Sequence, residues 1–133
     1  KEEHRMSKIL YEPSSVRGDF GTLIITETEP CKIPFIFEIP TITVNGESST
    51  YNISVDDYVI FCIKRHKRDI QSVIEHRVSG IKNNCAVLLL TQDDMDILST
   101  NTNFTLGATL YKADGQEIRV LISELPIKIR EVV

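Results

Sequence analysis

The sequence contains no tryptophan, few cysteines and no excess of positive charge. Its three cysteines, Cys31, Cys62 and Cys85, lie far apart, without a CxxC motif and without an even number to pair. This pattern argues against a zinc site and against a disulfide framework. Free cysteines within apolar runs usually behave as small buried hydrophobic residues. We therefore expect reduced, structural cysteines and synthesis in a cytosol.

Long hydrophobic runs and glycine-rich loops are also missing. No apolar run approaches the ~18 residues that a membrane-spanning helix needs, so no membrane partner is expected. The six glycines are scattered singly, which argues against a phosphate-binding loop. The formal net charge of −4 argues against nucleic-acid binding, because that function needs a concentrated positive field.

The length and composition that remain are those of one globular domain. The chain has 133 residues, of which 41% are hydrophobic and 26% charged. Residues 1–19 are polar, include Pro13 and Gly18, and show no periodicity. We therefore interpret 1–19 as a flexible or docking N-terminal arm, and we expect 20–133 to form a single β-sandwich domain.

From residue 20 onward, short β-rich runs alternate with turn signals. Asn45-Gly46 and Asp114-Gly115 predict hairpin turns. This pattern indicates an all-β fold, an antiparallel Ig-like β-sandwich of about 7–9 strands. The clearest predicted strands are 22–26, 33–39, 58–63, 73–78, 86–90, 104–111, 117–122 and 125–133.

Three of these strands carry a more specific prediction. Pro34 and Pro40 predict that 33–39 lies at a sheet edge, since proline cannot donate to a ladder. The dense apolar run 58–63 predicts a central strand, and 86–90 a buried one.

One short helix is predicted near 91–99. Thr91 and Asp94 have the spacing of a capping box, in which the hydroxyl accepts from an early amide and the carboxylate accepts from the cap amide. Met95 and Leu98 then form one apolar stripe, and the helix should end near Ser99.

No constellation of residues predicts catalysis or metal binding. The three histidines have no metal-ligand spacing, and His76, between Glu75 and Arg77, fits a half-exposed strand residue. The acidic cluster lacks the glycine and glutamate of an EF-hand, and acidic residues in a first helical turn already complement the helix dipole. We expect no enzyme activity and no catalytic, cofactor-binding or metal-binding residues. The histidines are His4, His66 and His76, and the acidic cluster is Asp93, Asp94 and Asp96.

Two further groups of residues suggest surfaces. The basic run 64–68 lacks interleaved aromatic residues, so a solvated hairpin tip is favoured over an anion-binding site. Tyr51, Tyr58 and Tyr111 are candidate platforms for a carbohydrate, although all three lie in strand patterns that could belong to a core.

The order of these pieces resembles a known family. The motifs that carry the resemblance begin with Val16-Arg17-Gly18-Asp19 before a strand and Tyr51-Asn52-Ile53-Ser54 before the run 58–64. They continue with Asn84 to Leu90 running into the capped helix, and with a final hairpin at Asp114-Gly115 followed by Pro126 to Ile129. Together they resemble the N-terminal domain of phage baseplate upper proteins, an Ig-like β-sandwich. The chain differs from that pattern at 31–49, where an extra prolyl strand and hairpin are inserted.

The resemblance implies a non-enzymatic structural or assembly module of a phage or prophage tail baseplate. Such a module would dock onto other tail proteins, carry receptor-binding components, form a homo-oligomer and reside in the virion after synthesis in the bacterial cytoplasm. The arm 1–17 and the insertion 31–49 would be its docking elements. The alternative reading is a carbohydrate- or cell-surface-binding β-sandwich, an adhesin or accessory domain.

Overall fold

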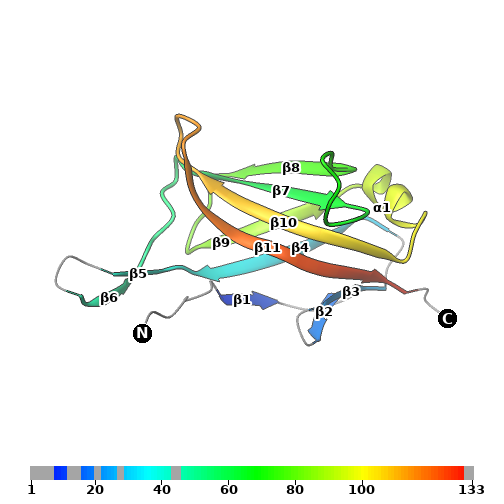
Figure 1. Ribbon diagram of the computed structural model, residues 1–133, viewed down its shortest axis with the longest axis horizontal. Helices are drawn as coiled ribbons and strands as arrows, with labels where there is room; N and C mark the ends of the chain where they lie inside the picture. The colour runs from blue at the N-terminus through cyan, green and yellow to red at the C-terminus, as the bar shows by residue number, and fades with distance from the viewer. Residues whose placement is uncertain (1–7, 12–15, 20–21, 27–28, 43–45, 131–133) are drawn as a thin grey trace.

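Two facing β-sheets form the body of the protein (Figure 1). The computed structural model describes residues 8–11, 16–19, 22–26, 29–42 and 46–130. The smaller sheet has the order β1-β4-β9, with β1 (Lys8–Tyr11), β4 (Cys31–Glu38) and β9 (Cys85–Leu90). The larger sheet has the order β2-β3-β11-β10-β7-β8, with β2 (Val16–Asp19), β3 (Thr22–Ile25), β7 (Tyr58–Lys64), β8 (Ile74–Ser79), β10 (Asn103–Tyr111) and β11 (Glu117–Ile129). The all-β prediction with one short helix is confirmed.

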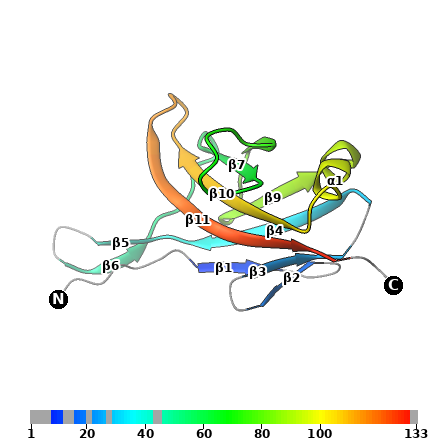
Figure 2. The same cartoon turned by 45° about the vertical axis from the view of Figure 1, so that its right-hand side comes forward.

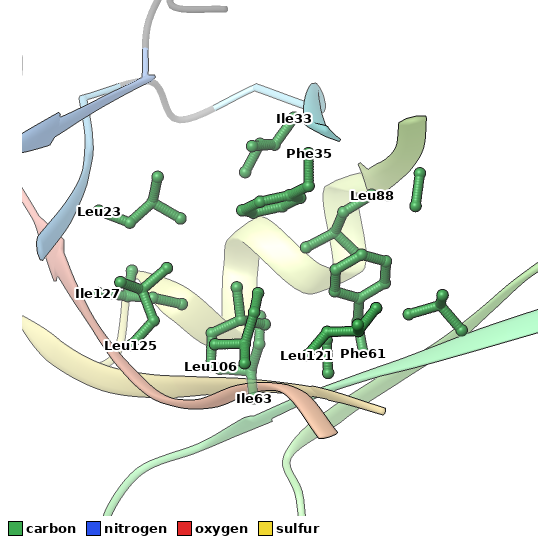
Figure 3. Packing of buried hydrophobic residues seen from close by; sticks show 14 of the residues in the cluster. Leu23, Ile33, Phe35, Phe61, Ile63, Leu88, Leu106, Leu121, Leu125 and Ile127 are labelled. Carbon is green, nitrogen blue, oxygen red and sulfur yellow. The ribbon is translucent and has the colours of Figure 1, made fainter. Parts of the chain in front are cut away.

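The hydrophobic core lies between these sheets, because alternate residues of each strand point inward. Phe35 of the small sheet contacts Phe61 of the large sheet, with ring centroids 5.4 Å apart. Figure 3 shows Ile33 and Leu88 beside Phe35, facing Ile63 and further residues of the large sheet. Burying each side chain of this size stabilises the fold by roughly 1.5–3 kcal/mol.

Most described strand pairs are antiparallel, as predicted, and one is not. β3 runs parallel to β11, with Leu23 opposite Ile127. Parts of the segment interpreted as an arm add strands to both sheets: β1 pairs with β4, and β2 forms an antiparallel pair with β3. The rest of 1–19 lies outside the described residues.

The position of β4 corrects the edge-strand prediction made from its prolines. β4 is the middle strand of the small sheet, between β1 and β9. Its pairing with β1 begins at Phe35, the residue after Pro34. The missing N–H of Pro34 therefore does not interrupt the described ladder with β1, which is why a proline is tolerated in this strand.

Two other strand predictions are corrected. β9 is buried on one face only, because Val87 and Leu89 are 39% and 49% exposed. β11 is one continuous strand over both predicted segments, with irregular register against β10. It curves strongly along its length (Figure 2). By contrast β7, predicted as a central strand, is paired on both sides, with β10 and with the edge strand β8.

A two-stranded ribbon projects from the body beyond the end of β4 (Figures 1 and 2). It consists of β5 (Pro40–Ile42) and β6 (Ser48–Thr50), paired antiparallel. The predicted hairpin is present and Gly46 has a φ of +85°, whereas Asn45 lies outside the described residues.

The helix prediction is confirmed in detail. α1 (Gln92–Leu98) begins after Thr91 and is capped at its end by Ser99. The Thr91 hydroxyl accepts from the Asp94 amide, and the Asp94 carboxylate accepts from the Thr91 amide. In the described part of the chain, no helix is long and apolar enough to cross a membrane.

Candidate interaction surface

A polar contact joins α1 to the edge of the large sheet. His76 has its side chain on the inner face of β8, on the same side as Ile74 and Val78. Its Nε2 atom lies 2.6 Å from Oδ2 of Asp94, which is buried in the first turn of α1. An ionised carboxylate can only accept hydrogen bonds, so Nε2 of His76 donates.

The environment of Asp94 favours its ionised form. Burial by itself would raise the pKa of this carboxyl, but hydrogen bonds from the Thr91 amide and from His76 outweigh that effect and leave the pKa below its usual range. The sequence predicted the capping role of Asp94. The contact with His76 was missed, because no local pattern places a strand residue beside a helix eighteen positions later.

A second buried polar side chain anchors the projecting ribbon. Asn84, with a φ of 56°, donates from Nδ2 to the carbonyl oxygens of Phe37 and Tyr51, and its Oδ1 accepts from the Ile53 amide. Phe37 precedes β5, and Tyr51 and Ile53 follow β6. One amide side chain thus binds both ends of the ribbon at its base. Sequence reasoning did not predict this anchoring role for Asn84.

The three tyrosines proposed as sugar platforms are engaged within the fold. The Tyr51 hydroxyl donates to Asp57 at 2.8 Å, and burial together with that carboxylate raises the pKa of Tyr51. Tyr58 stacks on Tyr111 with centroids 5.3 Å apart, and the Arg77 guanidinium lies 3.7 Å above the Tyr58 ring. Burial and the nearby Glu117 also raise the pKa of Tyr111. With Tyr111 and Arg77 against its ring, Tyr58 is only 8% exposed.

The basic run 64–68 begins at Lys64, the last residue of β7, and its other residues lie in the connection between β7 and β8, in agreement with the predicted hairpin tip. Lys67 approaches Glu124 at 3.9 Å, and both side chains are more than half exposed. An ion pair of this kind contributes little to stability. It borders a shallow hollow of about 250 Å³ on the outer face of the large sheet, over Gly107.

The edges of the two sheets meet at an open cleft of about 380 Å³ between β8 and β9. It is lined by His76, Arg77, Val78, Ser79, Val87, Leu89 and Thr91. Among the described strands, β8 pairs only with β7 and β9 pairs only with β4, and the first residue of β9, Cys85, also forms an isolated bridge with Lys82. β9 carries no charged residue, although charges on an edge strand are a common protection against pairing with other chains. This cleft, with the two strand edges beside it, is the candidate interaction surface.

In the part of the chain that the structure describes, no group of three or more His, Cys, Asp or Glu side chains converges on a metal-sized site. His66 is exposed in the β7–β8 connection, and His4 lies outside the described residues.

Comparison with known proteins returned no matching family model, no matching curated protein and no matching solved structure.

Proposed function

We propose that this domain is a non-enzymatic assembly module of a phage or prophage tail baseplate. It docks onto neighbouring tail proteins and carries receptor-binding components. The observation that carries the proposal is the cleft between β8 and β9, where two sheet edges with no described strand partner lie side by side. An unpaired strand edge can add a strand from another chain. A protein with such an edge therefore either binds a partner there or carries features that prevent unwanted pairing.

The chemistry of β9 supports use rather than protection. Val87 and Leu89 expose apolar surface on an uncharged strand, beside the edge that none of the described strands pairs with. Clustered apolar groups at an open edge favour contact with another protein over contact with a small polar ligand. The projecting β5–β6 ribbon, anchored by Asn84, is a second element suited to docking.

The assignment to a tail baseplate, and to the Ig-like form of the sandwich, rests on the sequence resemblance at Val16 to Asp19, Asn84 to Leu98 and Asp114 to Ile129. An assembly role in a baseplate would explain why the prominent surfaces of this domain are sheet edges and a projecting ribbon. Virion localisation follows from the same resemblance.

Mass spectrometry of purified tail particles tests the proposal, with particles prepared from the phage or induced prophage that encodes the chain. We expect the protein in several copies per tail. A matched preparation carrying Val87→Lys and Leu89→Lys should contain less of it, while Ser99→Lys, exposed beyond α1, should leave its amount unchanged. Absence of the wild-type chain from tails would overturn the proposal. Specific binding on a glycan array by a chain absent from tails would favour the carbohydrate-binding alternative.

A further inference from the structure

The sequence of β8 is chemically symmetric about His76. Ile74 and Val78 are apolar and lie two residues to either side of it. Between them lie Glu75 and Arg77, which have opposite charges and the same spacing from the centre. Because side chains alternate along a strand, Glu75 and Arg77 point to the outer face, and Ile74, His76 and Val78 point to the inner face.

The backbone edge on which these residues lie is available. β8 is the last strand of the large sheet, and none of the other described strands pairs with its second edge. Glu75 and Arg77 are exposed, and residues 76–79 line the open cleft. The contact of Arg77 with the Tyr58 ring holds the guanidinium over the outer face, where its N–H groups can still donate to a carboxylate.

We propose that the free edge of β8 pairs antiparallel with β8 of a second copy of this chain, about a two-fold axis at His76. Ile74 then lies opposite the partner's Val78, and Glu75 lies opposite the partner's Arg77, twice across the axis. The two large sheets join into one continuous sheet. The pairing names a surface and a partner for the proposed assembly function. It rests on that function only for its place in a tail baseplate.

Charge complementarity selects both the partner and the register. A shift of two residues in either direction would place Glu75 opposite Glu75 or Arg77 opposite Arg77, and like charges directly opposite are destabilising. A shift of one residue would turn inward-facing side chains toward the outer face. Parallel pairing would align each charge beside its own kind. Of these arrangements, only the antiparallel register centred on His76 places each charge opposite its opposite and Ile74 opposite Val78.

The test uses the full 133-residue chain, with sedimentation equilibrium and native mass spectrometry over a range of concentrations. The wild type should form a dimer of the 15.1 kDa chain. Glu75→Arg and Arg77→Glu, each alone, place like charges at both contacts and should weaken dimerisation at least about tenfold. Lys128→Glu, an exposed charge reversal on the interior strand β11, should leave it unchanged.

Two combinations separate charge pairing from damage to the fold. An equimolar mixture of the Glu75→Arg and Arg77→Glu chains should form heterodimers, because each charge again meets its opposite. The double variant that carries both changes should regain self-association. Thermal unfolding of each variant checks that the monomer remains folded, which matters most for Arg77→Glu because it loses the Tyr58 contact.

A wild-type chain that stays monomeric up to about 1 mM would overturn the inference. So would equal association of all variants, or an absence of heterodimers in the mixture of folded single variants. These outcomes are independent of tail incorporation. If the chain dimerises through β8 but is absent from tails, the inference stands and the proposed function is wrong. If the chain is monomeric but is found in tails, the proposed function stands and the inference is wrong.

Discussion

The Nε2 atom of His76 and the Oδ2 atom of Asp94 lie 2.6 Å apart, and through this contact the edge strand of the large sheet is tied to α1. The same carboxylate oxygen accepts from the Thr91 amide at 2.8 Å. One buried oxygen therefore holds both the start of the helix and its attachment to β8.

Asp94 should make stability depend on pH in the acid range. Its folded-state pKa lies below the usual 3.8, so the ionised carboxylate contributes stability that is present above that value and is lost as the pH falls toward the folded-state pKa. Asp94→Asn should lower the free energy of unfolding at pH 7 by about 1–2 kcal/mol and flatten its decline below pH about 4. Urea titrations across this range measure both effects. Asp93→Asn, in the same turn but exposed, is the control, and an equal effect of both changes would contradict the prediction.

His76→Phe should destabilise the fold, because the Asp94 carboxylate then stays buried but loses the hydrogen bond that His76 donates to it. A buried group without its partner costs about 1–3 kcal/mol. His66→Phe changes an exposed residue in the neighbouring loop and should stay within about 0.5 kcal/mol of the wild type. Chemical denaturation at pH 7 compares the two, and equal stabilities would show that the contact contributes nothing.

Asn84→Gly should release the base of the β5–β6 ribbon. Glycine accepts the positive φ, so the loss isolates the three side-chain hydrogen bonds to Phe37, Tyr51 and Ile53. We expect a loss of about 2–4 kcal/mol and faster hydrogen exchange at the Ile53 amide. Asn83→Gly is the matched control, since its φ of 55° is also positive and its side chain is exposed. That change should be neutral or slightly stabilising, and unaltered exchange at Ile53 in the Asn84 variant would refute the anchoring role.

Adjacent leucines on β9 should respond differently to truncation. Leu88 is 1% exposed and lies in the core, whereas Leu89 is 49% exposed on the outer face. Leu88→Ala should cost about 2–5 kcal/mol, since it leaves a cavity. Leu89→Ala should cost less than about 1 kcal/mol. The difference is measured by urea unfolding of the isolated chain, and similar losses would mean that β9 is buried on both faces in solution.

The local elements were largely predictable because their signals are local. The Thr91–Asp94 capping box specifies where α1 begins, and it formed as expected. The alternation of apolar and polar residues in β10 and the dense apolar run of β7 predicted the bounds of both strands to within one residue. The two-strand prediction for 117–133 failed because Pro126 and the polar pair before Leu125 interrupt the pattern, whereas the strand continues through them opposite β10.

The sequence by itself determined that this chain forms β-strands and where its helix is capped, because propensity, capping and alternation act between near neighbours. The tertiary structure decided the rest: that β4 lies in the middle of its sheet, that β3 runs parallel to β11, and that Asn84 and Asp94 bind residues far away in the chain. Strand partners are chosen by packing and backbone pairing across large sequence separations, and no window of neighbouring residues contains that information. The open edges of β8 and β9, on which the proposed assembly depends, exist only once those partners have been chosen.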